Sequence, residues 1–284
     1  MVNFLSPSNK SKNSSSCSFS ELPVKYTKKS LLYWSHIIIF TVILFNKFYI
    51  LCMINTYIFF LELGLFYCYG INDDGFSYLE NLKFLEYLNV NETHITTETL
   101  CKILRRNTRM RHLYIGGEDE NLNPDKIVME LRNSCPDLES IKLRYNRNVH
   151  ARLNILTSKG INDLAGCKNL REMYLDWCHN NIIFFSNCSG ASFFRVFSSC
   201  QHLERVSLYY CEGLTERDIR ALALCKNLKK LDLTGILRCV TSEICHTIFM
   251  NCHKLEMINL RYSNIAKCLI LQWQQKYTHI TITA

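Results

Sequence analysis

Cysteine is the residue type in this sequence with the widest choice of chemistry. The chain holds 15 cysteines among 284 residues, a lower density than that of a small disulfide scaffold. Thiolates can bind zinc or attack a substrate, but no two cysteines stand at the C-x-x-C spacing of zinc and redox sites. Histidine follows directly after Cys178, Cys245 and Cys252. Because adjacent side chains diverge on a helix or strand, we expect no shared metal site, no cofactor and no catalytic Cys/His pair.

Five of the cysteines instead open copies of one pattern, C-x-x-L-x-x-L-x-L. These copies (CPDLESIKL, CKNLREMYL, CQHLERVSL, CKNLKKLDL and CHKLEMINL) begin at Cys135, Cys167, Cys200, Cys225 and Cys252. Copies without the cysteine begin at Leu82, Asn107 and Gln274, and the steps between starts are 25, 28, 32, 33, 25, 27 and 22 residues. A period in the twenties is typical of leucine-rich repeats, so we expect the cysteines to be buried, reduced and structural.

The repeat predicts both the strands and the helices of the fold. The L-x-L core is a short strand with alternate residues inward, and the following residues form a helix that returns the chain to the next strand. The expected fold is therefore an α/β leucine-rich-repeat solenoid, a horseshoe with a parallel concave sheet and outer helices. Helix starts are predicted after Thr96 or Thr97, Asn123, Thr215 and Thr241. The longest steps contain segments 150–160 and 179–190, which we expect to be loop insertions.

The first 70 residues differ in character from the repeats. Residues 1–30 are rich in Ser, Asn and Lys and are expected to be disordered. Residues 31–70 are strongly apolar, and three interpretations stay open: a membrane anchor within 31–69, a translated AT-rich intron, or a buried helical cap. Residues 71–284 form the predicted repeat domain of about eight repeats.

The charge distribution argues against nucleic acid as a partner. Of the formal net charge of +8, half lies in residues 1–30, where five lysines and one glutamate give +4. The repeat region is only weakly basic and shows no basic stripe with stacked aromatic residues.

Several repeat segments carry a resemblance to a known family. LREMYLDWC, CKNLKKLDLTG, CHKLEMINLRYSNIAKCLILQW and the closing YTHITI resemble the cysteine-containing repeats of F-box/leucine-rich-repeat proteins, and look most like the subgroup called F-box/LRR-repeat protein 4. The resemblance covers about three quarters of the chain. It implies a substrate-recognition subunit of a Skp–cullin–F-box ubiquitin ligase, with Skp bound by the F-box. Leu22-Pro23 could open an F-box, but the apolar run follows at once, so we expect the F-box to be missing or truncated.

The residues between the inward leucines are expected to line the concave sheet and to bind a protein partner. Tyrosine and arginine, which dominate binding hot spots, are both present there. The predicted partner-binding residues are Tyr87, His112, Tyr114, Lys142, Arg144, Glu172, Tyr174, Asp176, Arg205, Tyr209, Lys230, Asp232, Asn259 and Arg261. We therefore expect a non-enzymatic, cytoplasmic binding module, with Skp and cullin as further partners if a functional F-box exists. The alternative is a membrane-anchored repeat scaffold without a ligase role.

Overall fold

The computed structural model describes residues 61–117, 122–145, 156–177, 192–211 and 214–284 of the chain. In this part of the chain, nine strands form a single parallel sheet in which each strand lies beside its neighbours in sequence. The strands are β1 (Glu62–Gly64), β2 (Tyr87–Asn89), β3 (His112–Gly117), β4 (Ser140–Tyr145), β5 (Glu172–Trp177), β6 (Arg205–Ser207), β7 (Lys230–Asp232), β8 (Met257–Asn259) and β9 (Thr281–Thr283).

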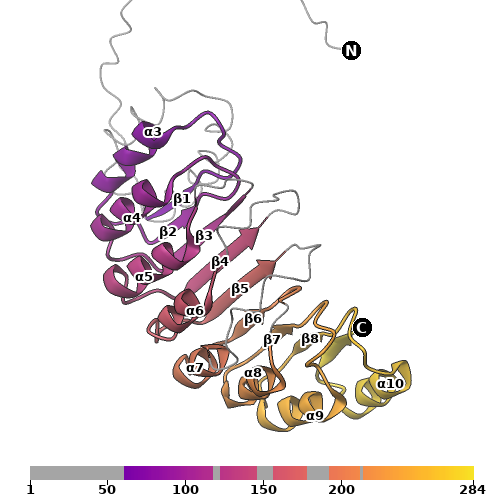
Figure 1. The fold of residues 1–284 in the computed structure, drawn as a ribbon. Coiled ribbons are helices and arrows are strands. Elements are labelled where there is room, and N and C mark those ends of the chain that lie inside the picture. The colour runs from indigo at the N-terminus through magenta and orange to yellow at the C-terminus, as the bar shows by residue number, and fades with distance from the viewer. Residues whose placement is uncertain (1–60, 118–121, 146–155, 178–191, 212–213) are drawn as a thin grey trace, which may run out of the picture.

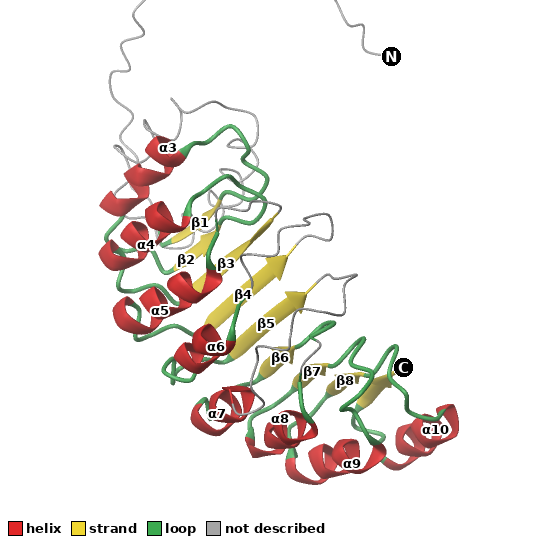
Figure 2. Ribbon diagram, viewed as in Figure 1, coloured by secondary structure: helices red, strands yellow, loops and turns green. Residues whose placement is uncertain are grey.

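A helix follows each strand except the last and packs on one face of the sheet. The α-helices are α3 (Asp73–Ser77), α4 (Thr97–Arg106), α5 (Pro124–Ser134), α6 (Ser158–Leu164), α7 (Ser192–Ser199), α8 (Glu216–Ala221), α9 (Ser242–Asn251) and α10 (Lys267–Lys276). Short 3-10 helices, η1 (Tyr78–Asn81) and η3 (Leu222–Leu224), extend α3 and α8. The helices lie on the outside of an arc and the strands on its inside (Figure 1 and Figure 2). The predicted leucine-rich-repeat solenoid is confirmed.

The core is a stack of inward side chains that repeats from strand to strand. In register across the sheet, Leu113 pairs with Ile141, which pairs with Met173 in the next strand, and all three are fully buried. Full burial of one such side chain contributes about 1.5–3 kcal/mol. Because each repeat buries its apolar residues only against its neighbours, the solenoid is stable as a stack.

The sheet begins one repeat earlier than the sequence predicts. Strand β1 pairs with β2, Leu63 opposite Leu88, and Leu65 is almost fully buried. These residues lie in the segment 31–70, outside the repeat domain that the sequence pattern predicts from residue 71. The pattern was hidden because Leu61 and Phe66 are apolar as well, so the alternation of inward and outward positions could not be seen.

The last repeat is also shifted relative to the predicted frame. Register places Ile258 beside Ile282, so the last copy starts at Lys276 and not at Gln274. In the segment THITI, Ile280 and Ile282 alternate with polar residues, and a slip by two residues keeps the same residues on each face. The pattern alone therefore could not decide between the two registers.

The helix starts follow the predicted caps. The side chains of Thr96, Asn123 and Thr241 accept hydrogen bonds from the backbone N–H groups of Thr99, Lys126 and Ile244. Thr215 and Asp218 form a reciprocal capping box at the start of α8.

One predicted loop insertion is partly wrong. We expected residues 150–160 to be a loop, but α6 begins at Ser158 behind an N-cap at Thr157. The Asp125 carboxylate accepts hydrogen bonds from the Thr157 backbone N–H (2.8 Å) and hydroxyl (2.5 Å). Gly160 lies so close that an added Cβ would come within 2.3 Å of Asp125 Oδ1, which explains a glycine in the first turn of a helix. Segment 179–190 lies outside the described residues.

The apolar N-terminal run is described only from residue 61 onward. Across the described parts of the chain, no helix has the length and apolar character to cross a membrane. Residues 1–60, including the predicted disordered segment and most of the apolar run, lie outside the described residues.

Candidate functional site

The repeat cysteines hold neighbouring repeats together. Cys135, Cys167, Cys200, Cys225 and Cys252 are all buried free thiols, as predicted. The Cys200 thiol contacts the carbonyl oxygens of Leu164 (3.7 Å) and Cys167 (3.5 Å) in the preceding repeat, and the Cys225 thiol contacts Phe197 O (3.5 Å). Leu164 and Phe197 lie in the last turns of α6 and α7, where backbone carbonyls lack a partner within the helix. The thiols are weak donors to these carbonyls.

Asn107 shows that the cysteine position has a hydrogen-bonding role. It opens a repeat copy that lacks the cysteine, and its fully buried side-chain amide donates to the carbonyl oxygens of Leu79 (3.1 Å) and Ile103 (2.8 Å). The thiols remain protonated donors because burial raises the pKa of Cys135, Cys167 and Cys200 to about 12. A buried thiol with a raised pKa is a poor nucleophile and a poor metal ligand.

The Cys-His pairs diverge as expected where they are described. Cys245 and Cys252 point into the core, while His246 and His253 are exposed. Cys178 lies outside the described residues. Within the described ranges, no three His, Cys, Asp or Glu side chains gather closely enough to hold a metal ion.

The predicted partner-binding residues lie on the strands, or directly after them, at the outward positions of the inner sheet face. Arg144, Lys230 and Arg261 are exposed, and the other described members are half-buried between neighbouring strands. The side chain of Asp176 lies outside the described residues. The structure therefore brings the residues of β2 to β6 together across adjacent strands.

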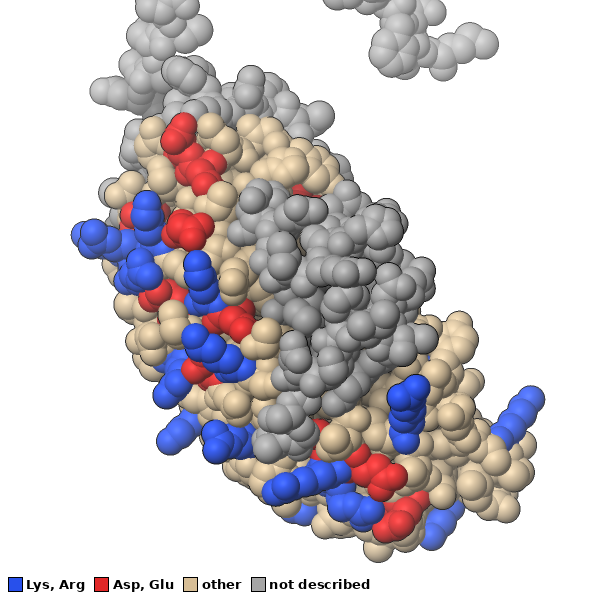
Figure 3. All heavy atoms as spheres, in the orientation of Figure 1, with Lys and Arg blue, Asp and Glu red and all other residues tan. Residues whose placement is uncertain are grey.

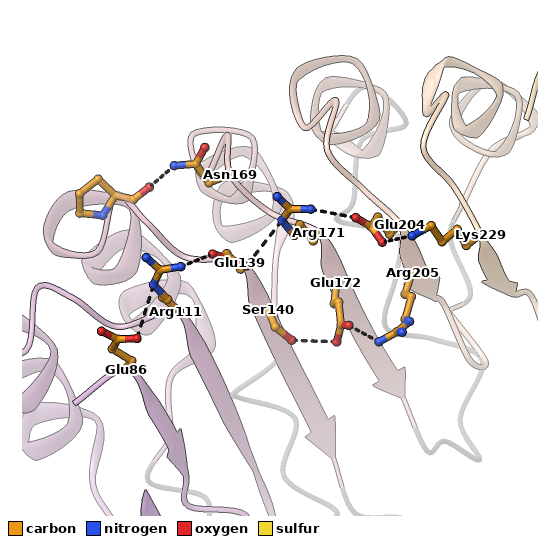
Figure 4. A network of polar contacts seen from close by, with 11 residues as sticks. Glu86, Arg111, Glu139, Ser140, Asn169, Arg171, Glu172, Glu204, Arg205 and Lys229 are labelled. Atoms are coloured by element: carbon orange, nitrogen blue, oxygen red, sulfur yellow. Dashed lines mark hydrogen bonds and ion pairs between the residues drawn. The ribbon is translucent and has the colours of Figure 1, made fainter. Parts of the chain in front are cut away.

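A polar network crosses β4, β5 and β6 on this face. Glu172 accepts hydrogen bonds from Arg205 and from the Ser140 hydroxyl (3.4 Å), as Figure 4 shows. The Lys142 ammonium lies 5.6 Å from the centre of the Tyr174 ring. Burial and the nearby Glu172 raise the pKa of the Tyr174 hydroxyl, so it remains a neutral donor and acceptor. The network presents cations and a tyrosine on a fixed backbone.

Aromatic side chains continue this surface toward β2. The Tyr87 and Tyr114 rings meet edge to face with centres 5.2 Å apart, and the His112 ring lies 6.2 Å from Tyr87. Desolvation by burial raises the pKa of Tyr87. Such rings offer a large contact area with few rotatable bonds, which suits a protein partner.

Two predicted binding residues have structural hydrogen bonds. Asp232 Oδ1 accepts from the Thr234 backbone N–H (2.9 Å) and hydroxyl (2.6 Å). Asn259 Oδ1 accepts from the Arg261 backbone N–H (3.2 Å). These are Asx turns that close the strand end, as in the equivalent Asn89, whose Oδ1 accepts from the Asn91 N–H (3.1 Å).

Sequence reasoning missed a ladder of alternating charges at the amino ends of the strands. We call it the charge ladder: Glu86, Arg111, Glu139, Arg171, Glu204 and Lys229, one from each of six successive repeats. Every cation bonds the acid of a neighbouring repeat (Figure 4), for example Arg171 Nη1 to Glu204 Oε1 at 2.8 Å and Lys229 Nζ to Glu204 Oε2 at 2.7 Å. Comparing the residue before each strand across the copies would have revealed the alternation.

The charge ladder borders a shallow polar hollow of about 110 Å³. Its lining includes Arg111, Asp137, Glu139, Asn169, Arg171 and His202. Since Arg111 and Arg171 both pair with Glu139, the charges there are already balanced. In the view of Figure 3, basic and acidic side chains are likewise interspersed along the described surface.

Fold and surface together define a leucine-rich-repeat solenoid with an open, polar and aromatic sheet face. No protein-family model matches the chain. Among solved structures it is similar to a chain in the crystal structure of the Rad7 and Elc1 complex in yeast, at 16% sequence identity and a TM-score of 0.42. That match covers 66% of this chain and 60% of the other.

Proposed function

We propose that this chain is a non-enzymatic protein-binding subunit whose concave face holds a protein partner. The observation that carries the proposal is the strip of side chains across β2 to β6, in which the Tyr87 and Tyr114 rings meet and Tyr174 lies beside the cations Lys142 and Arg205. These side chains are half-buried against one another, so little conformational entropy is lost when a partner binds them. Repeat solenoids use their extended concave surfaces in this way.

Within this role we propose substrate recognition for a Skp–cullin–F-box ubiquitin ligase. The support is the resemblance of segments such as CKNLKKLDLTG to F-box/leucine-rich-repeat proteins. Because the F-box is expected to be missing or truncated in this chain, Skp and cullin are proposed as partners only if a functional F-box exists, and a ligase subunit of this kind would act in the cytoplasm.

Reconstitution with purified subunits tests the ligase role. The full-length chain is mixed with a Skp subunit and then with a cullin, and complex formation is followed by size-exclusion chromatography. Co-elution with Skp that is lost when Leu22 and Pro23 are both replaced by alanine supports the ligase role and shows that a functional F-box begins there. Elution of the chain and Skp as separate species contradicts the ligase role while leaving the binding face untouched.

The concave face itself is tested by chemical cross-linking in cells. Cross-linked partners are compared between the wild type and Tyr114→Ala/Tyr174→Ala, with the exposed outer residue Met250→Ala as the matched control. The expected result is a set of cross-links to one protein that the double variant loses and the control retains. An unchanged set in the double variant contradicts the assignment of this face.

The apolar run favours a second candidate, a membrane-tethered repeat scaffold. Residues 31–69 are long enough to span a bilayer once. Alkaline carbonate extraction of membranes from cells expressing the full-length chain separates the two candidates. Retention in the membrane pellet supports the scaffold, and release into the supernatant excludes a spanning segment.

A further inference from the structure

The turns after six of the strands, β1, β2, β3, β6, β7 and β8, contain a residue with positive φ. Tyr67, Glu92, Tyr210 and Tyr262 have φ angles of 61°, 54°, 53° and 59°, and at the same repeat position Gly117 and Gly235 have 147° and 77°. This left-handed region suits glycine and strains a residue with a side chain, most of all a bulky one. Tyrosine nevertheless occupies three of these six described turns.

Tyr210 is half-buried, but packing into the core does not account for Tyr67 or Tyr262. The Tyr67 side chain is 54% exposed and that of Tyr262 is 67% exposed, the largest exposure among the exposed large apolar and aromatic residues described. A ring that stays exposed buries little apolar surface. Its packing therefore does not offset the free-energy cost of the positive φ at the same residue. Strained positions of this kind gather at sites of function.

The aromatic residues of the turns after β6 and β8 form a row across the intervening turn after β7. The Tyr209 and Tyr210 rings meet edge to face with centres 4.7 Å apart, and Tyr262 follows 6.3 Å from Tyr210. Between them Gly235 leaves room for the Tyr210 ring, because an added Cβ would lie 2.5 Å from a ring carbon. Because β6, β7 and β8 are neighbours in the sheet (Figure 1), the row spans three repeats at the carboxyl ends of these strands.

The described charged side chains of these turns are both basic, while Glu212 lies outside the described residues. In the described residues of the loops 209–215, 234–240 and 261–266, Arg238 and Arg261 are the charged side chains, and both are exposed. Leu237 beside them is 49% exposed. We call Tyr209, Tyr210, Tyr262, Arg238 and Arg261 the tyrosine edge. It combines rigid aromatic rings with arginine, the composition of binding hot spots.

We propose that the tyrosine edge binds an extended acidic segment of a partner protein. Carboxylates of the segment pair with Arg238 and Arg261, and its apolar side chains pack on the rings of Tyr210 and Tyr262. The surface goes beyond the concave-face proposal, because it needs neither a ligase role nor the strip across β2 to β6. A protein segment fits better than an anionic membrane, since membrane recognition by charge takes a cluster of roughly 4–8 basic residues.

The test is a binding titration with a defined probe. A fluorescent peptide of alternating glutamate and leucine is titrated with the full-length chain, and its anisotropy is compared with that of a peptide in which lysine replaces glutamate. Binding of the glutamate peptide alone is expected. Absence of binding, or equal binding of both peptides, overturns the proposal.

Two matched substitutions separate binding from folding. Tyr262→Gly removes the ring and relieves the positive φ, so we expect about a tenfold or greater loss of peptide affinity with an unfolding midpoint that is unchanged or higher. Tyr67→Gly makes the same change in an equivalent turn far along the sheet, and we expect it to leave affinity unchanged. A lower midpoint for Tyr262→Gly would show that the ring serves stability, and equal affinity losses in both variants would show a non-specific effect; either result overturns the proposal.

Further variants distinguish the surfaces and the ligand class. Arg238→Ala/Arg261→Ala is expected to weaken peptide binding and to reduce its dependence on salt. Tyr174→Ala, on the concave face, is expected to retain peptide binding even if the cross-linking of the concave face changes. Loss of peptide binding in Tyr174→Ala, or displacement of the peptide by phosphatidylserine vesicles, contradicts the tyrosine edge as its site.

Discussion

The two edges of the sheet, at the amino ends and at the carboxyl ends of the strands, connect one repeat to the next in different ways. At the amino ends of the strands, the charge ladder links neighbouring repeats through paired side chains such as Arg171 and Glu204. At the carboxyl ends, strained turns expose rings such as Tyr262. The amino edge is chemically satisfied, whereas the carboxyl edge carries strain and exposed apolar surface. We infer that the first serves the fold and the second serves recognition.

The largest effect is expected where the carboxyl edge needs glycine. Gly235→Ala adds a Cβ at a φ of 77°, within 2.5 Å of the Tyr210 ring. Strain and crowding together are expected to lower the free energy of unfolding by about 2–3 kcal/mol, measured by urea denaturation. Adding Tyr210→Ala should recover the part that is due to crowding, and a stability equal to wild type for Gly235→Ala would contradict the close contact.

Reversing one charge is expected to weaken the amino edge by a smaller amount. Arg171→Glu places three acids in a row with Glu139 and Glu204, which should lower the free energy of unfolding by about 1–2 kcal/mol at low salt. Lys168→Glu, an equal change of charge on an exposed residue of the same repeat, is the control and should have little effect. Because salt screens exposed charges, the loss should shrink at high ionic strength, and a loss independent of salt would argue against the ladder.

The charge ladder should also make stability depend on pH. The hydrogen bond from Lys229, followed by that from Arg171, lowers the pKa of Glu204 in the folded chain. A carboxyl group with a depressed folded pKa binds fewer protons when folded, so its stabilisation is present above its unfolded pKa and is lost as pH falls through its folded pKa. We expect the difference in urea midpoint between the wild type and Glu204→Gln, worth less than about 1 kcal/mol, to disappear in acid. A difference that persists at low pH would assign the effect to packing.

The smallest effect is a gain. Tyr67→Gly relieves a φ of 61° without removing a buried side chain, and should raise the free energy of unfolding by about 0.5–1 kcal/mol. The measurement is the urea midpoint, with Tyr67→Ala as the control, which keeps the strain and should show no gain. Equal gains in unfolding free energy for both variants would show that loss of the ring, and not relief of the positive φ, stabilises the protein.

Much of the architecture could be predicted from the repeat frame, because strand residues such as Leu170 and Leu175 recur with fixed spacing beside Cys167. Strand positions could not be predicted where apolar and polar residues do not alternate in a way that fixes the register. The strand at Leu63 was hidden in a continuous apolar run, and the frame at Ile282 allowed a slip by two residues.

The functional surfaces were less accessible from the sequence. The frame locates outward residues such as Tyr174, but it could not separate Asp232, whose carboxylate closes a turn, from residues whose side chains face a partner. The tyrosine edge depends on backbone angles, and a φ of 59° at Tyr262 has no signature in residue type, since glycine would have been expected there. The charge ladder, by contrast, was visible in principle as a column of alternating signs.

The buried thiols are natural probes of local opening in this solenoid. The thiols of Cys135, Cys200, Cys225 and Cys252 each contact a carbonyl oxygen of the preceding repeat. Burial raises the pKa of these thiols and keeps them unreactive while the contact lasts. Opening of a single repeat exposes its own sulfur and leaves the others covered. The rate at which each cysteine reacts with an alkylating reagent therefore reports the opening of one repeat, and the set of rates maps local stability along the arc.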